Sequence, residues 1–224
     1  MIGNGTGSEP RVAVVGVGGA GCNVVSSFYD ACCPVDTIAI NTDKDALHET
    51  RADLKLYICR EVLHGEGARG DAVLGRRCAD IHTEEIREAV AGYDAVFVIA
   101  GLGGGTGSGA MPVVIEAAQS QGVEAYAVAI SPFTFEGGRR AAAREAWAHV
   151  RAVCECSVLV DNDKVLEVMP DLTMGQAFGQ VNVSIREHVL SCAAIIASTR
   201  RRAEPEAAEG DAGATYPIEA LISA

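Results

Sequence analysis

The chain has 224 residues, and 49% of them are hydrophobic, which is enough to bury the core of one large domain. Its 18 Lys and Arg residues stand against 30 Asp and Glu, and the formal net charge of -12 excludes a general attraction to nucleic acids and anionic membranes. No apolar run approaches the roughly 20 residues of a membrane-spanning helix, and residues 1–10 lack the basic and apolar parts of a signal peptide, so we expect a cytoplasmic protein with no direct membrane insertion.

The first part of the chain predicts a βαβ unit. Residues 11–17 are a short β-branched run that ends at a group of glycines, and residues 22–30 carry apolar side chains at helical spacing. A second strand is predicted over residues 35–40, followed directly by Asn41 and Asp43. The crossover between the two strands is expected to be right-handed.

A third strand and a long loop come next. Residues 54–58 alternate like a strand, and residues 59–71 form a glycine-rich loop, which in a compact domain is usually functional. Residues 72–90 have a helical pattern with a break near residue 82, where the side chain of Thr83 is predicted to cap the second piece.

The stretch at residues 101–109 is the most distinctive feature of the sequence. It follows a predicted strand at residues 94–100, precedes a helical pattern at residues 110–121, and contains six glycines in nine positions. Glycine lets a bound group approach the main chain closely, and a helix start presents unpaired N–H groups, which the hydroxyls of Thr106 and Ser108 can help to cap. This arrangement predicts a phosphate cradle.

The rest of the chain continues the alternation. Strands are predicted at residues 123–130 and 157–160, and helices at residues 139–153, 164–169 and 173–199. The fold class is therefore α/β: a Rossmann-like three-layer sandwich with a mostly parallel sheet, ending in a long central helix. We expect residues 1–10 to form a flexible N-terminus, residues 11–199 to form one domain, and the acidic residues 200–224 to form a tail.

Other short motifs point to different functions, and each is incomplete. Residues 16–21 match GxGxxG directly after a strand, which favours the alternative of an NAD-dependent oxidoreductase, but that site needs an acid where this chain has Asn41. Neither glycine loop contains the lysine of a P-loop, and residues 107–109 do not form the GxSxG elbow of a hydrolase. The eight cysteines and five histidines show no metal-ligand spacing, so no metal site is predicted. A degenerate scaffold that binds no nucleotide is a further alternative.

Residues 103–109, Gly-Gly-Gly-Thr-Gly-Ser-Gly, resemble the signature of the tubulin/FtsZ family. Five further motifs resemble those of FtsZ and occur in the family's order, at residues 15–23, 38–43, 132–140, 162–166 and 177–182. The resemblance covers residues 11–197. It implies that the ligand is GTP or GDP, with or without Mg²⁺, and that the chain is a cytoskeletal or cell-division subunit or modulator.

The resemblance also implies which residues hold the nucleotide. Glu136 would bind the ribose hydroxyls, Arg140 would reach the phosphates, and Phe178 would stack on guanine, while Asn162 and Asn182 would bond its edge. These pairings also make chemical sense, because a carboxylate suits a diol, arginine suits phosphate and an aromatic ring suits a base. The remaining members of the implied site, mostly amides around the phosphates, are Gly18, Gly19, Ala20, Gly21, Cys22, Asn23, Asn41, Asp43, Gly70, Gly103, Gly104, Gly105, Thr106 and Gly107.

The sequence departs from the family in two places. Residues 66–71 are more charged than the family's usual glycine and alanine stretch, and the long helix is not followed by an N-x-D-x-x-D match to the acidic loop that acts on the next subunit's GTP. No catalytic residue is therefore assigned, and we expect nucleotide binding with weak or no autonomous GTP hydrolysis. The expected partners are a guanine nucleotide, a second copy of the chain or a full-length FtsZ-type protein, and no nucleic acid.

Overall fold

Six strands form the centre of the molecule: β1 (Val12–Val17), β2 (Asp36–Asn41), β3 (Leu54–Tyr57), β4 (Ala95–Gly101), β5 (Glu124–Ser131) and β6 (Ser157–Asp161). The computed structural model describes residues 10–63 and 65–203, and in it these strands pair in the order β3-β2-β1-β4-β5-β6. Every pairing is parallel, with Val15 of β1 opposite Ile38 of β2 and Val98 of β4. The predicted α/β class and parallel sheet are confirmed.

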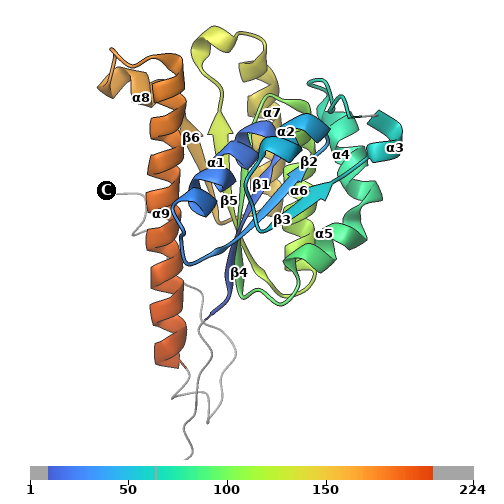
Figure 1. Ribbon diagram of the computed structural model, residues 1–224, viewed down its shortest axis with the longest axis vertical. Coiled ribbons are helices and arrows are strands. Elements are labelled where there is room, and N and C mark those ends of the chain that lie inside the picture. Colours follow the sequence, from blue (N-terminus) through green and yellow to red (C-terminus); the bar gives the residue numbers. More distant parts are fainter. Residues whose placement is uncertain (1–9, 64, 204–224) are drawn as a thin grey trace, which may run out of the picture.

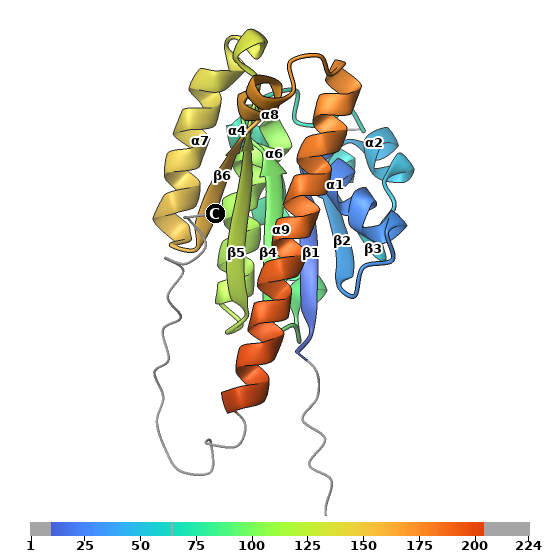
Figure 2. The same ribbon diagram turned by 90° about the vertical axis from the view of Figure 1, so that its left-hand side faces the viewer.

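The strands are connected by helices that cover both faces of the sheet. These are α1 (Gly18–Asp30), α2 (Lys44–Glu49), α3 (Arg60–Leu63), α4 (Ala72–Ile81), α5 (Thr83–Val90), α6 (Gly105–Gln119), the 3-10 helix η1 (Thr134–Glu136), α7 (Arg139–Val153), α8 (Asp163–Val168) and α9 (Met174–Ala203). Figure 1 shows α9 along one side of the sheet and α4 and α5 along the other, and Figure 2 shows α9 in front of the sheet, running roughly along the strands.

Alternate residues of the central strands feed two separate cores. Val14 of β1 belongs to the core under α1 and α9, whereas its neighbour Val15 belongs to the core under α4, α5, α6 and α7. β1 is buried along its whole length, because helices cover both faces of the sheet. A strand in that position is expected to be a nearly continuous apolar run, as β1 is. This two-sided burial fixes the register of the sheet and therefore the places where its loops emerge.

Residues 18–21 and 105–109 of the two glycine loops belong to helices, and residues 102–104 form the turn before the second helix. The sequence predicts helices that begin at residues 22 and 110, but α1 begins at Gly18 and α6 at Gly105. Glycine is a poor helix former, at a cost of about 1 kcal/mol per residue against alanine. Here tertiary packing outweighs that cost, since a Cβ on Gly18, Gly21, Gly105 or Gly107 would lie only 2.3–2.8 Å from neighbouring backbone atoms.

Other elements differ from the predictions in detail. The break near residue 82 is confirmed, but the predicted Thr83 cap is wrong, because its hydroxyl donates back to the carbonyls of Ala79 and Asp80. The loop at residues 59–71 contains the short helix α3, and α9 continues to Ala203, beyond the predicted end at residue 199. The predicted flexible N-terminus and most of the predicted tail, at residues 1–9 and 204–224, lie outside the described residues.

The helices of the described part of the chain fall short of what a membrane span requires. None of those within residues 10–63 and 65–203 combines the length and the hydropathy that crossing a bilayer requires.

Candidate nucleotide site

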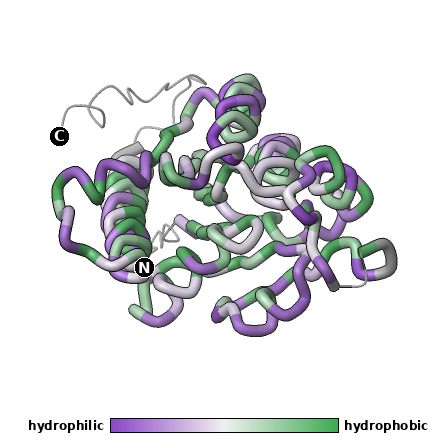
Figure 3. The backbone as a smooth tube through the Cα atoms, turned by 90° about the horizontal axis from the view of Figure 1, so that it is seen from above, coloured by the Kyte–Doolittle hydropathy of each residue, from purple (hydrophilic) through white to green (hydrophobic). Residues whose placement is uncertain are grey.

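An open cleft of about 600 Å³ lies where the loops after the strands meet, at the carboxyl edge of the sheet. Its walls come from the start of α1, the loops after β2 and β3, the start of α6, the loops after β5 and β6, and the first turns of α9. Figure 3 gives the view from above onto these loops. Open α/β sheets bind their ligands at this edge, so the cleft is the candidate site.

Two helix N-termini, those of α1 and α6, meet in the cleft. A Cβ on Gly18 would lie 2.8 Å from the backbone N of Gly107, and a Cβ on Gly107 would lie 2.4 Å from the carbonyl oxygen of Gly101. Gly18 also has a φ of 71°, which disfavours any other residue. With side chains excluded, the first backbone N–H groups of two helices lie together, and their partial positive charges suit an anion such as phosphate.

Most of the sequence-predicted site residues line this one cleft. They are Gly19, Ala20, Asn23, Asn41, Asp43, Gly70, Gly104, Gly105, Thr106, Gly107, Glu136, Asn162, Phe178 and Asn182. They come from seven separate segments of the chain, which only the folded sheet brings together. The predicted residues that do not line the cleft are Gly18, Gly21, Cys22, Gly103 and Arg140.

Four of those five residues, Gly18, Gly21, Cys22 and Gly103, lie behind the helix starts and pack against neighbouring segments. A Cβ on Gly21 would lie 2.3 Å from the carbonyl oxygen of Ile99, and one on Gly103 would lie 2.5 Å from that of Arg139. Cys22 is buried, and burial raises the pKa of its thiol to about 12, so the sulfur stays protonated and neutral. Their contribution is to shape the backbone that faces the cleft.

Two buried amide side chains in the cleft wall each have an atom without a hydrogen-bond partner. Asn41 is 2% exposed; its Oδ1 accepts from the backbone N of Thr42 at 2.9 Å and of Asp43 at 3.3 Å, but its Nδ2 has no partner. Asn162 is 3% exposed, and its Oδ1 has none. A buried polar atom without a hydrogen-bond partner costs about 1–3 kcal/mol of stability. These two atoms therefore suit a polar ligand that forms hydrogen bonds with both.

The hydroxyls of the second glycine loop serve other purposes than capping α6. The N-cap residue of α6 is Gly104, with no side-chain hydrogen bond, so the predicted capping by Thr106 and Ser108 is wrong. Ser108 Oγ instead accepts from the backbone N of Gly103 at 2.9 Å, and Thr106 Oγ1 lies 2.6 Å from Thr42 Oγ1. The pair of threonines ties the loop after β2 to the start of α6.

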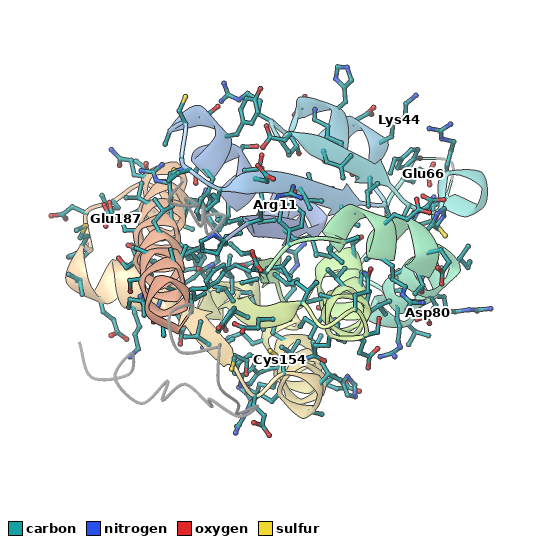
Figure 4. The ribbon with its side chains drawn as sticks, turned by 90° about the horizontal axis from the view of Figure 1, so that it is seen from below. Arg11, Lys44, Glu66, Asp80, Cys154 and Glu187 are labelled. Atoms are coloured by element: carbon teal, nitrogen blue, oxygen red, sulfur yellow. The ribbon has the colours of Figure 1, made fainter. Side chains whose placement is uncertain are left out.

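Charged side chains line the cleft as ion pairs. Glu136 Oε2 pairs with Arg139 Nη1 at 2.9 Å, while Glu136 Oε1 accepts from the backbone N of Phe133 at 2.9 Å. Glu66 pairs with Arg69, and Figure 4 shows Glu66 on the same side of the molecule as Lys44. Arginine side chains that can exchange a carboxylate for phosphate are therefore present on both sides of the two helix starts.

Three of these residues were missed from the sequence: Glu66, Arg69 and Arg139. The charged character of residues 66–71 was a signal for the first two. Arg139 adjoins the predicted Arg140, but nothing in two consecutive arginines distinguishes which of them faces a ligand.

An aromatic side chain at the start of α9 offers a flat surface to the cleft. Phe178 is 45% exposed, and its ring lies edge-on to that of buried Phe133, with 5.2 Å between centroids. Asn182 lies four residues further along α9 and lines the same wall. An exposed aromatic face beside an amide suits a heterocyclic base, which stacks on the first and bonds to the second.

The donor set in the cleft also fits a nucleotide better than a metal held by protein alone. The part of the chain that the structure describes contains no group of three or more His, Cys, Asp or Glu side chains arranged for a metal ion. A Mg²⁺ ion held chiefly by phosphate oxygens and water needs only one or two protein oxygens, which Asp43 or Glu66 could supply.

Comparison with known proteins agrees with this geometry. Residues 11–170 match the family described as "Tubulin/FtsZ family, GTPase domain". The chain is 38% identical over 182 residues to the cell division protein FtsZ 2 of Halobacterium salinarum, and 42% identical over 172 residues to FtsZ 1 of Pyrococcus horikoshii. These alignments cover 81% and 76% of this chain but 46% of each relative, so the chain spans about half of their length.

Solved structures give the same result. An empty FtsZ dimer from M. jannaschii superposes with a TM-score of 0.79 at 33% identity, covering 84% of this chain and 55% of that one. CetZ2 from Haloferax volcanii, solved as a GTPγS-bound protofilament, superposes with a TM-score of 0.73 at 29% identity, covering 82% of this chain and 58% of that one. The chain therefore belongs to the tubulin/FtsZ family, within which it matches the GTPase domain.

Proposed function

We propose that this chain binds a guanine nucleotide, GTP or GDP, in the cleft at the carboxyl edge of its sheet. The observation that carries the proposal is the pair of unpartnered buried amide atoms, Asn41 Nδ2 and Asn162 Oδ1, in a wall that also receives two helix N-termini. An anionic ligand that carries both hydrogen-bond acceptors and N–H donors would form hydrogen bonds with the two amide atoms and with the helix N-termini. Guanine supplies N–H donors on its edge, and the phosphates supply the charge and the acceptors.

The family resemblance gives each group a position on the nucleotide. The phosphates lie over the first turns of α1 and α6, the ribose lies near Glu136, and the base stacks on Phe178 with Asn182 and Asn162 at its edge. Mg²⁺ bound to the phosphates would offset their charge; when bound, it supplies electrostatic stabilisation of the leaving phosphate. Burial of Asn41 where a dinucleotide enzyme needs a carboxylate argues against the NAD alternative.

Nucleotide selectivity tests the proposal. Titration calorimetry on nucleotide-free protein is expected to give binding of GDP and GTP that is at least roughly 100-fold tighter than that of ADP or NAD, which corresponds to about 2.7 kcal/mol. Selectivity of this size is reasonable because an adenine edge leaves buried amide atoms unpaired. Preferred binding of NAD would favour the oxidoreductase alternative, and no binding of any nucleotide would favour the degenerate scaffold.

We also propose that these 224 residues hydrolyse GTP slowly when they act alone. Among the described residues that line the cleft, the carboxylates are Asp43, Glu66 and Glu136, and each is engaged. Asp43 caps α2 by accepting from Ala46 N at 2.9 Å, and the two glutamates form the ion pairs given above. Phosphoryl transfer to water needs a group that positions the nucleophile, and in the ligand-free structure each of these carboxylates is bound to another partner.

The rate of phosphate release from GTP tests this expectation. The rate is expected on the order of 10⁻⁴ s⁻¹ per molecule or slower, the scale of a phosphate-binding fold without its positioning groups. It is also expected to stay constant per molecule as the protein concentration rises. A rate that increases with protein concentration would instead mean that one copy completes the site of another.

A role in the cytoskeleton or in cell division, as a subunit or as a modulator, follows from the same family membership. The FtsZ relatives are cell division proteins by name, and the chain matches about half of their length. Association with a second copy or with a full-length FtsZ-type protein remains a prediction from the resemblance.

A further inference from the structure

The outer edge of β6 is an open end of the sheet. β6 is the last strand in the order of six, so the backbone N–H and C=O groups on its outer side have no strand partner within residues 10–63 and 65–203. Its side chains are open as well, since Val158 is 42% exposed and Leu159 is 40% exposed. An exposed apolar edge strand is a template for pairing with a further strand.

The two exposed side chains of β6 lie on opposite faces of the sheet. Val158 is opposite Val128 of β5, which belongs to the core under α1 and α9. Leu159 is opposite Ala129 of β5, which belongs to the core under α6 and α7. Because parallel sheets are normally covered on both faces, a partner for this edge has to cover an apolar side chain on each of them.

The strand at the other edge of the sheet is protected against such pairing. β3 carries Lys55, whose Nζ donates to the carbonyl oxygen of His48 at 3.0 Å. A lysine on an edge strand discourages the addition of another strand. β6 has the sequence Ser-Val-Leu-Val-Asp, with no charged residue before its last position. The two edges therefore differ, and only β6 presents an uncharged apolar run.

The chain itself contains a short apolar segment that fits this edge. Residues 218–222 have the sequence Ile-Glu-Ala-Leu-Ile. In an extended strand successive side chains point to opposite faces, so Ile222 and Leu221 would cover one face each. One antiparallel register places Ile222 beside Val158. The same register places Leu221 beside Leu159, so that each exposed side chain of β6 gains an apolar neighbour.

The stretch of chain between α9 and this segment is long enough to reach β6. α9 begins beside the cleft, runs roughly along the strands and ends beyond the ends at which the strands begin (Figure 2). Its 30 residues measure about 45 Å. Residues 204–217 can span roughly 46–50 Å when extended, which is enough to return along the whole length of α9.

The handedness of the fold selects an antiparallel strand. α6 and α7, which connect β4 to β5 and β5 to β6, pack on the face of the sheet opposite to α9. A parallel strand beyond β6 that is reached through α9 would continue in the same direction from the other face, so its crossover would have the rare left hand. An antiparallel strand has no such restriction, and the reach of residues 204–217 lets it start at the carboxyl end of β6.

We propose that residues 218–222 add an antiparallel strand to the outer edge of β6 in the same molecule. Main-chain hydrogen bonds to the free edge supply the affinity, and the apolar side chains on the two faces supply the fit. The same molecule is favoured over a second copy, because a linker of this length gives a local concentration on the order of millimolar. In addition, two chains that each carry a formal charge of -12 repel one another.

Amide hydrogen exchange, measured by NMR on the whole chain, tests the proposal. The amides of residues 218–222 are expected to exchange at least about tenfold more slowly than in a synthetic peptide of the same sequence. Combining Leu221→Asp with Ile222→Asp is expected to abolish this protection, because both apolar contacts are lost. The matched control combines Ala212→Asp with Ala214→Asp, which adds the same charge to the linker and is expected to keep the protection. Exchange at the peptide rate in the unaltered chain would overturn the proposal.

Nuclear Overhauser effects between methyl groups identify the partner of the segment. In the unaltered chain they are expected between Ile222 and Val158 and between Leu221 and Leu159, and the protection is expected to be independent of protein concentration. Protection that increases with concentration would assign the edge to a second copy and overturn the proposal. Methyl contacts of the segment with an element other than β6 would overturn it as well. Neither readout needs a nucleotide, so the result does not depend on the proposed function.

Discussion

Replacing Gly107 with alanine is expected to lower the thermal midpoint of the ligand-free protein by roughly 4–8 °C. The added Cβ would lie 2.4 Å from the carbonyl oxygen of Gly101 and 3.4 Å from that of Val17, and both oxygens belong to rigid central strands. Overpacking of this kind costs about 3 kcal/mol, while alanine recovers about 1 kcal/mol of helix propensity. The clash outweighs the propensity, and the net loss is about 2 kcal/mol.

Gly19→Ala is the matched control, because it also adds a Cβ to the first turn of a helix that opens into the cleft. No atom lies within 4 Å of a Cβ built on Gly19, so this variant is expected to keep or slightly raise the thermal midpoint. Its methyl group projects from a residue that lines the cleft, and we expect GDP to bind about tenfold more weakly.

Calorimetry and thermal unfolding of both variants decide between packing and binding roles for these glycines. An unaltered midpoint for Gly107→Ala would mean that the helix start can move away from β4. Unaltered GDP affinity for Gly19→Ala would place the phosphates elsewhere than over α1.

The strands and the position of the site could be predicted because their signals are local. The apolar runs that became β1 and β4 consist mostly of consecutive apolar residues and end at glycine loops, so they can be recognised without knowledge of their neighbours in space. A parallel sheet then brings the loops after its strands to one edge, so residues as distant as Asn41 and Phe178 could be assigned to one site.

The division of labour inside the site could not be predicted, because it depends on distances between segments. Gly21 and Gly103 belong to binding motifs, yet their contacts are with backbone behind the cleft. Two consecutive arginines on a helix point in different directions, so only the fold distinguishes Arg139 from Arg140. The unpartnered atoms of Asn41 and Asn162 result from burial among groups that the sequence does not place.

Asn41→Asp is expected to weaken GDP binding at neutral pH by more than roughly 100-fold, the largest effect of any substitution proposed for the cleft. The carboxylate keeps an oxygen for the backbone N–H groups of Thr42 and Asp43, so the turn after β2 is preserved. It replaces the unpartnered Nδ2 donor with a negative charge two residues before Asp43, in the cleft where we propose that the phosphates bind. Loss of the donor and like-charge repulsion therefore act in the same direction.

The pH dependence of this variant separates electrostatics from damage to the loop. A protonated carboxyl regains a donor and loses its charge, so the deficit in GDP affinity is expected to shrink as the pH falls through the pKa of the introduced group. The wild-type amide does not titrate and is the reference at each pH. Asn41→Ala, which removes the bonds to Thr42 and Asp43 as well, is expected to lose affinity equally at every pH and also to unfold at a lower temperature. A deficit in Asn41→Asp that is constant with pH would mean that the Nδ2 group does not face the nucleotide, and the orientation proposed for the phosphates would then be wrong.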